Sequence, residues 1–126
     1  MTSPAILVFD PDATSFQTVQ KSFFNENVDV VWASPLGPEQ VRALQCAIIL
    51  YAVRTTEDYE RAYEINRTFE DAVMFLLADQ YFYDAFEARN AGAVGAFFKP
   101  LHVSRIYERI VELLPNFSVN NGVGTL

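Results

Sequence analysis

The chain has few of the side chains on which catalysis and cross-linking depend. Its 126 residues include one histidine, His102, and one cysteine, Cys46. A single histidine leaves little for general acid–base catalysis, and no metal-ligand cluster or phosphate loop is visible. A lone cysteine excludes an internal disulfide and is typical of a reducing cytoplasm. The sequence therefore predicts a protein that is not an enzyme and that holds no metal or cofactor.

Basic residues and long apolar runs are also scarce. Nine Lys and Arg against sixteen Asp and Glu give a formal net charge of −7, which disfavours nucleic acid, since such binding relies on cations at phosphates. The longest apolar run, Ala72–Ala78, is far below the ~20 residues of a membrane helix. Residues Met1–Phe9 carry no basic region of a signal peptide. We therefore expect a cytoplasmic domain whose partners are proteins, with no nucleic acid or membrane among them.

Half of the residues are apolar, enough for one core, and their spacing alternates between two periods. Runs typical of buried parallel strands lie at Ala5–Phe9, Val28–Trp32, Ala47–Tyr51, Val73–Leu77 and Val94–Phe98. Helical spacing of apolar residues follows Asp12 and recurs at Ala62–Phe69 and Phe82–Phe86. It is clearest at Val103–Leu114, and it is weakest and shortest around Val41 and Leu44.

This alternation predicts an α/β fold of the flavodoxin-like (βα)5 type. Right-handed crossovers and the chain length favour a doubly wound parallel sheet with strand order 2-1-3-4-5. We expect residues 1–114 to form one domain. Residues 115–126, rich in Asn and Gly, are expected to form a flexible tail or a linker to a downstream domain.

Ligands of such sheets bind beyond the carboxyl ends of the strands, so the residues there are the candidate site. The run Ile6–Asp10 resembles the first strand of response-regulator receiver domains, which are CheY-like. Gly92–Pro100 resembles their last strand, with its Gly-Ala turn and closing Lys-Pro. Element order and spacing match over about residues 4–114. The chain is therefore similar to receivers of two-component signalling over nearly its whole length.

The resemblance implies where a phosphorylation site would lie. Receivers end the first strand with two adjacent acids that hold Mg²⁺, and here these positions carry Asp10 and Pro11. The phosphoacceptor position at the end of the third strand carries Tyr51 instead of Asp. The position of the hydroxyl residue in the fourth strand carries Leu77. Most of the phosphorylation chemistry is therefore missing.

The receiver's switch is also missing, because its aromatic position in the fifth strand carries Ala96. Only Asp10 and Lys99 match the family pattern, and we expect them to form a salt bridge beside a cis Lys99-Pro100 bond. One carboxylate next to an ammonium is a poor site for Mg²⁺. A phenol is neutral at pH 7, so Tyr51 cannot replace the phosphoacceptor. We expect its ring to fill the vacated pocket, with its hydroxyl bonded to Asp10 or Lys99.

The sequence thus favours a pseudo-receiver, a signalling module that binds proteins without phosphorylation and in one fixed conformation. One alternative is a receiver with a rearranged acidic site of Asp10, Asp12 and Asp79, although Asp12 and Asp79 are expected to cap the first and fourth helices. Another is a small-ligand-binding flavodoxin-like domain. The loop Asp10–Ser15 disfavours it, because acids repel phosphate and Pro11 lacks an amide donor.

Receivers contact partners or form homodimers through the fourth helix, fifth strand and fifth helix. This stretch of the sequence is rich in aromatic residues. We expect the core to contain Phe82, Phe86 and Phe97. The candidate contact residues are the amphipathic tyrosines Tyr81, Tyr83 and Tyr107.

Overall fold

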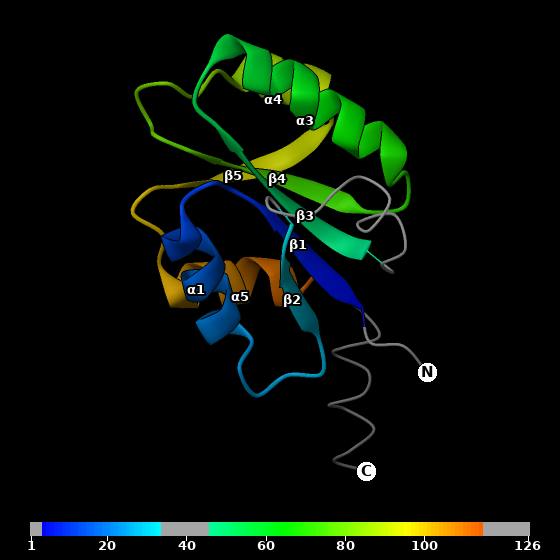
Figure 1. The fold of residues 1–126 in the computed structure, drawn as a ribbon, viewed down its shortest axis with the longest axis vertical. Coiled ribbons are helices and arrows are strands. Elements are labelled where there is room, and N and C mark those ends of the chain that lie inside the picture. Colours follow the sequence, from blue (N-terminus) through cyan, green and yellow to red (C-terminus); the bar gives the residue numbers. More distant parts are fainter. Residues whose placement is uncertain (1–3, 34–45, 115–126) are drawn as a thin grey trace.

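The computed structural model describes residues 4–33 and 46–114. In that part of the chain a single parallel sheet has the order β2-β1-β3-β4-β5. Its strands are β1 (Ala5–Phe9), β2 (Asp29–Trp32), β3 (Cys46–Val53), β4 (Val73–Ala78) and β5 (Ala93–Phe98). The predicted flavodoxin-like α/β class and strand order are confirmed (Figure 1).

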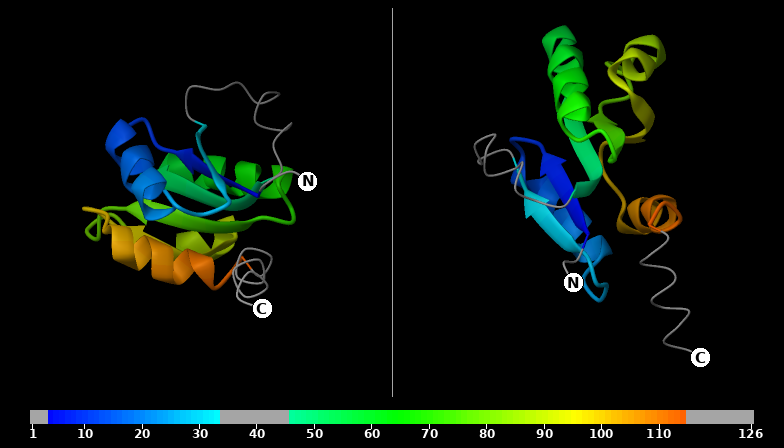
Figure 2. Two further views of the ribbon diagram at one scale, coloured as in Figure 1. Left: turned by 90° about the horizontal axis from the view of Figure 1, so that it is seen from below. Right: turned by 90° about the vertical axis from the view of Figure 1, so that its right-hand side faces the viewer.

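Helices cover both faces of the sheet. They are α1 (Ala13–Ser22), α3 (Thr56–Thr68), α4 (Ala85–Ala91) and α5 (Val103–Val111). Helices α1 and α5 lie on one face, and α3 and α4 lie on the other (Figures 1 and 2). None of these helices has the length and apolar run needed to cross a membrane. The predicted short helix around Val41 and Leu44, and the predicted tail, lie outside the described residues.

The strands are apolar at consecutive positions because each face of the sheet packs against helices. Between the sheet and α1 and α5, fully buried residues include Ile6, Leu50 and Ile106. On the other face, Ile49 and Met74 pack with the small residues of α3 and α4. Two apolar layers therefore fix the sheet, and the carboxyl ends of its strands form one edge.

Helix α4 begins later than the sequence predicts. The helical spacing starts at Phe82, but the helix starts at Ala85, because the Asp84 carboxylate accepts hydrogen bonds from the amides of Phe86 (2.9 Å) and Glu87 (3.1 Å). The Asp79 carboxylate instead accepts from the Tyr81 amide (2.8 Å) in the preceding turn. The prediction that Asp79 caps the fourth helix is therefore wrong.

Candidate functional site

Loops at the carboxyl edge of the sheet bring together residues from distant parts of the chain. Asp10 follows β1, Arg54 follows β3, Asp79 follows β4 and Lys99 follows β5. A cavity of about 420 Å³ opens at this edge, and it is lined by Asp12, Thr14, Ser15, Thr18, Asp79, Lys99, Pro100 and Leu101. The Lys99-Pro100 bond is cis, as predicted. The edge is the place where doubly wound sheets bind ligands.

Asp10 is the centre of this edge and is fully buried. Its Oδ1 accepts hydrogen bonds from the Asp12 amide (2.9 Å) and from Nη2 of Arg54 (3.4 Å). Its Oδ2 accepts from Oγ of Ser15 (2.6 Å) and from Nζ of Lys99 (2.7 Å). Four donors therefore surround one carboxylate, as the burial of a charge requires.

Two of these donors are cations, so the carboxylate is more than neutralised. The predicted salt bridge between Lys99 and Asp10 is confirmed, and the Lys99 side chain is 28% exposed. Arg54 forms a second ion pair from the more exposed side, with a side chain that is 54% exposed. The Asp10 carboxylate is thus in contact with two positive charges, and the exposed Asp12 carboxylate in the same loop interacts with both cations. The two bound cations therefore weaken the attraction of the Asp10 carboxylate for a further cation.

Asp12 serves the backbone of α1, as predicted. Its carboxylate accepts from the amide (3.0 Å) and the hydroxyl (2.6 Å) of Thr14, and these bonds lower the pKa of Asp12. Asp79 serves its own turn in the same way. In residues 4–33 and 46–114, no group of three or more His, Cys, Asp or Glu is arranged to hold a metal ion.

No protein family model and no curated protein matches this chain. Solved structures do match it. A response regulator from Thermotoga maritima is 20% identical, with 90% of this chain and 98% of that chain covered and a TM-score of 0.76. A signal receiver domain from Bacteroides fragilis is 20% identical (88% and 96% covered, TM-score 0.71). The Vibrio cholerae chemotaxis protein CheY4 is 14% identical (90% and 100% covered, TM-score 0.72).

This chain has the receiver-domain fold. The receiver positions inferred from the sequence can therefore be located in space. Pro11 is exposed next to Asp10. Leu77 is fully buried in the core between the sheet and α1 and α5. Ala96, at the switch position, is half-buried and packs against the core on the α3 and α4 face.

Tyr51 lies in β3 but does not fill a pocket beside Asp10. Its neighbours in the sheet are Phe9 and Leu76, and its ring packs against that of Phe9, with 5.4 Å between the centroids. Burial raises the pKa of the Tyr51 hydroxyl, and the nearby Asp58 raises it further. Tyr51 is not among the hydrogen-bond partners of Asp10 or Lys99. The expected hydrogen bond is therefore wrong, because Tyr51 faces the α3 side of the sheet.

The three candidate tyrosines do not form one surface. Tyr81 is 91% exposed, and Tyr83 is half-buried with its ring edge-on to Phe98. Tyr107 of α5 instead turns toward α1, where its hydroxyl donates to Glu26 (2.9 Å) and its ring packs on Phe23. The structure brings Tyr81 and Tyr83 to the α4 end of the expected face and leaves Tyr107 elsewhere.

Sequence reasoning missed three residues around Asp10. Ser15 and Arg54 bind its carboxylate, and Trp32 of β2 donates from Nε1 to its main-chain oxygen (2.8 Å) while stacking on Phe16. A basic residue directly after the third strand was a usable signal for Arg54, because that position meets the same edge. The Trp32 contact has no such signal, since it depends on a side-chain direction.

Proposed function

We propose that this chain is a cytoplasmic pseudo-receiver, a signalling module that binds proteins without aspartyl phosphorylation and without enzymatic activity. The observation that carries the proposal is the Asp10 carboxylate, which is buried and held by Lys99 and Arg54. In the receiver pattern this carboxylate helps to hold Mg²⁺. Here its oxygens already accept hydrogen bonds from four protein donors.

The charge balance argues against a metal at this edge. A unit charge at ~4 Å from another is worth on the order of 4 kcal/mol of gross energy at an effective dielectric of 20. Mg²⁺ dehydrates reluctantly and relies on carboxylates and phosphate oxygens. A cation entering here meets Lys99 and Arg54, and neither Pro11 nor Tyr51 supplies a carboxylate. A different observation argues against the rearranged site, because the carboxylates of Asp10, Asp12 and Asp79 do not form a group that could hold a metal ion among the described residues.

Loss of the switch supports a fixed conformation. A ligand changes a conformational equilibrium only if it binds two states with different affinity. In a receiver, the phosphoacceptor, the hydroxyl residue of the fourth strand and the switch aromatic together couple phosphorylation to a change of conformation. Here these positions carry Tyr51, Leu77 and Ala96. Leu77 is fully buried and offers no hydroxyl to a phosphoryl group. Partner binding is therefore constitutive and depends on surface residues.

The direct test is chemical inertness. Beryllofluoride with Mg²⁺ should leave the amide NMR spectrum unchanged at Asp10, Tyr51 and Asp79, because the phosphoacceptor position carries a tyrosine and the Asp10 carboxylate is already bound by Lys99 and Arg54. A receiver that carries the full acidic set, treated identically, serves as the positive control. Clustered shifts around Asp10 in this chain would contradict the proposal.

The contact surface that we propose lies on α4 and β5, which pack against each other. Three apolar side chains are exposed there: Phe86 (67%), Val94 (56%) and Phe98 (44%). The prediction that Phe86 belongs to the core is wrong, because α4 begins at Ala85 and turns this residue outward. Exposed apolar groups on neighbouring elements are typical of a protein interface. We propose self-association through this face, with the fourth helix, fifth strand and fifth helix of each copy in contact.

Phe86→Glu should weaken self-association about tenfold or more, since it replaces the most exposed apolar side chain of this surface with a charge. Sedimentation velocity over a concentration series measures the effect. Phe24→Glu is the matched control, because Phe24 is 81% exposed and follows α1 on the opposite face of the sheet. Equal behaviour of the two variants, or a wild-type chain that never associates, would exclude this surface.

A further inference from the structure

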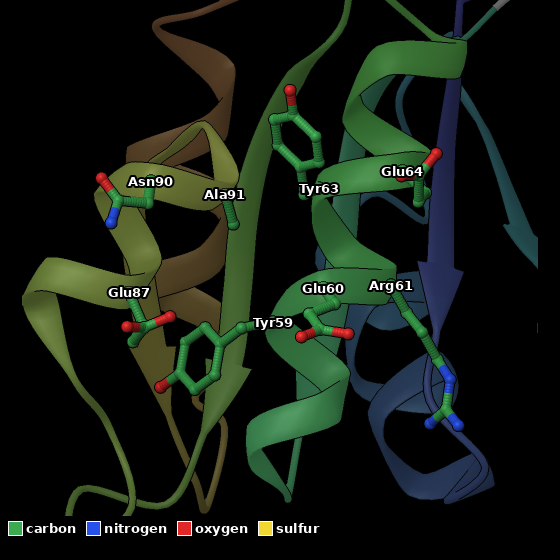
Figure 3. Close-up of a pocket in the computed structure, with 8 residues that line it drawn as sticks. All are labelled: Tyr59, Glu60, Arg61, Tyr63, Glu64, Glu87, Asn90 and Ala91. Carbon is green, nitrogen blue, oxygen red and sulfur yellow. The ribbon is translucent and has the colours of Figure 1, made fainter.

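A second surface lies between α3 and α4, away from Asp10 and from the exposed side chains of β5. It is a groove of about 550 Å³, lined by Tyr59, Glu60, Arg61, Tyr63, Glu64, Glu87, Asn90 and Ala91 (Figure 3). This volume lies in the range of sites that enclose a ligand or a few side chains. The groove belongs to none of the receiver positions discussed above.

The floor of the groove is an aromatic side chain whose hydroxyl is fixed by two hydrogen bonds. Tyr59 is 4% exposed and reaches from α3 toward α4 (Figure 3). Its hydroxyl accepts from the Asp84 amide (2.9 Å) and donates to the Phe82 carbonyl (3.5 Å). These bonds tie α3 to the start of α4. The two walls are therefore fixed relative to each other before any partner binds.

One wall already accommodates a guanidinium group. Tyr63 is 43% exposed, and the Arg67 guanidinium carbon lies over its ring, 5.7 Å from the centroid. Such stacking is the preferred contact of arginine with an aromatic face. The ring of Tyr63 thus stacks with a planar cation, and an arginine of a partner can take the place of Arg67 on it.

The charges in the groove are unbalanced. Glu60, Glu64 and Glu87 form no ion pair with any residue in the described part of the chain. Arg61 pairs with Glu57 and Asp58, and it points away from α4 (Figure 3). Burial, followed by nearby charges that include Glu87, raises the pKa of Tyr59. The groove therefore presents a negative potential on an aromatic floor.

We propose that this groove binds an arginine-bearing segment of a protein partner. A guanidinium can stack on Tyr63 and bond the glutamates in a bidentate manner, whereas an acidic peptide or a nucleic acid is repelled. A bare metal ion does not fit, because these carboxylates do not converge among the described residues. This inference is independent of the proposed function, since it uses neither the Asp10 edge nor the exposed apolar side chains Phe86, Val94 and Phe98, although the groove shares helix α4 with that surface.

The test is fluorescence anisotropy with a labelled peptide of alternating arginine and alanine, and with the same peptide carrying neutral citrulline. Wild-type protein should bind the arginine peptide and lose at least tenfold in affinity for the citrulline peptide. Glu64→Gln with Glu87→Gln should weaken arginine-peptide binding about tenfold. Tyr63→Leu should weaken it too, through loss of the ring face.

A matched control separates the groove from the net charge. Glu108→Gln with Glu112→Gln removes the same charge at α5, on the other face of the sheet, and should leave binding within about twofold. No binding by the wild-type protein, equal binding of citrulline, or equal weakening by the control pair would each overturn the proposal. Circular dichroism of every variant checks that it folds, and none of these outcomes depends on the response to beryllofluoride.

Discussion

Asp10→Ala should destabilise the folded chain by about 3 kcal/mol, which is the first of the two largest effects that we expect. The substitution removes a fully buried carboxylate and leaves its donors without an acceptor. Removing one partner of a buried ion pair lowers stability, because the other charge stays without a partner. The buried Ser15 hydroxyl, which also loses its acceptor, lowers stability further. Because Lys99 and Arg54 are partly exposed, water can solvate them in the variant, and we expect a loss of stability at the low end of the range for buried ion pairs. Urea unfolding measures the change in free energy.

Asp12→Ala is the matched control for this variant. Asp12 is exposed and caps α1 with hydrogen bonds to Thr14, so its loss should cost about 1 kcal/mol. Two acids in one loop are thus compared, one at the centre of a buried network and one at a helix end. Equal losses of unfolding free energy in the two variants would show that the contacts of Asp10 with Lys99 and Arg54 contribute little to stability.

Tyr51→Asp should also destabilise the chain, by about 2–4 kcal/mol, without restoring phosphorylation. The ring is half-buried against Phe9, and Asp58 lies near enough to raise the hydroxyl pKa. A carboxylate at this position loses the ring packing and adds a negative charge in the same place. Urea unfolding reports the stability, and mass spectrometry after treatment with acetyl phosphate and Mg²⁺ reports phosphate uptake.

The control is Tyr51→Phe, which keeps the ring and should change stability by less than about 1 kcal/mol. A Tyr51→Asp variant with wild-type stability that also takes up phosphate would show that Tyr51 stands in an otherwise working site. A stable variant without phosphate uptake would instead mean that the packing against Phe9 contributes little.

Most of the fold follows from the sequence, because parallel strands and amphipathic helices have distinct apolar spacing. The bounds of β1 match the prediction, whereas β3 extends from Cys46 to Val53, beyond the predicted Ala47–Tyr51. The family pattern placed the strand end at Tyr51, while the apolar pair Ala52 and Val53 continues the ladder with β4. A strand end depends on pairing with its neighbour, and one strand's residues do not reveal that pairing.

The candidate site was predicted less completely than the fold. Its ion pair of Asp10 and Lys99 followed from the resemblance, because both positions match the family pattern. The second cation, Arg54, lies 44 residues from Asp10 in the chain, and no pattern shared with receivers marks it. The direction of Tyr51 was also missed, since one step along a strand moves a side chain to the other face of the sheet.

The contact between Trp32 and the loop of Asp10 gives the chain a built-in optical reporter. Trp32 is the only tryptophan in the sequence, it is half-buried, and its indole is hydrogen-bonded to the main chain of Asp10. The emission of an indole depends on the polarity around its ring and on its bond partners. Intrinsic fluorescence of the unlabelled protein therefore reads the carboxyl edge of the sheet directly, so one spectrum follows both global unfolding and any local rearrangement around the buried carboxylate.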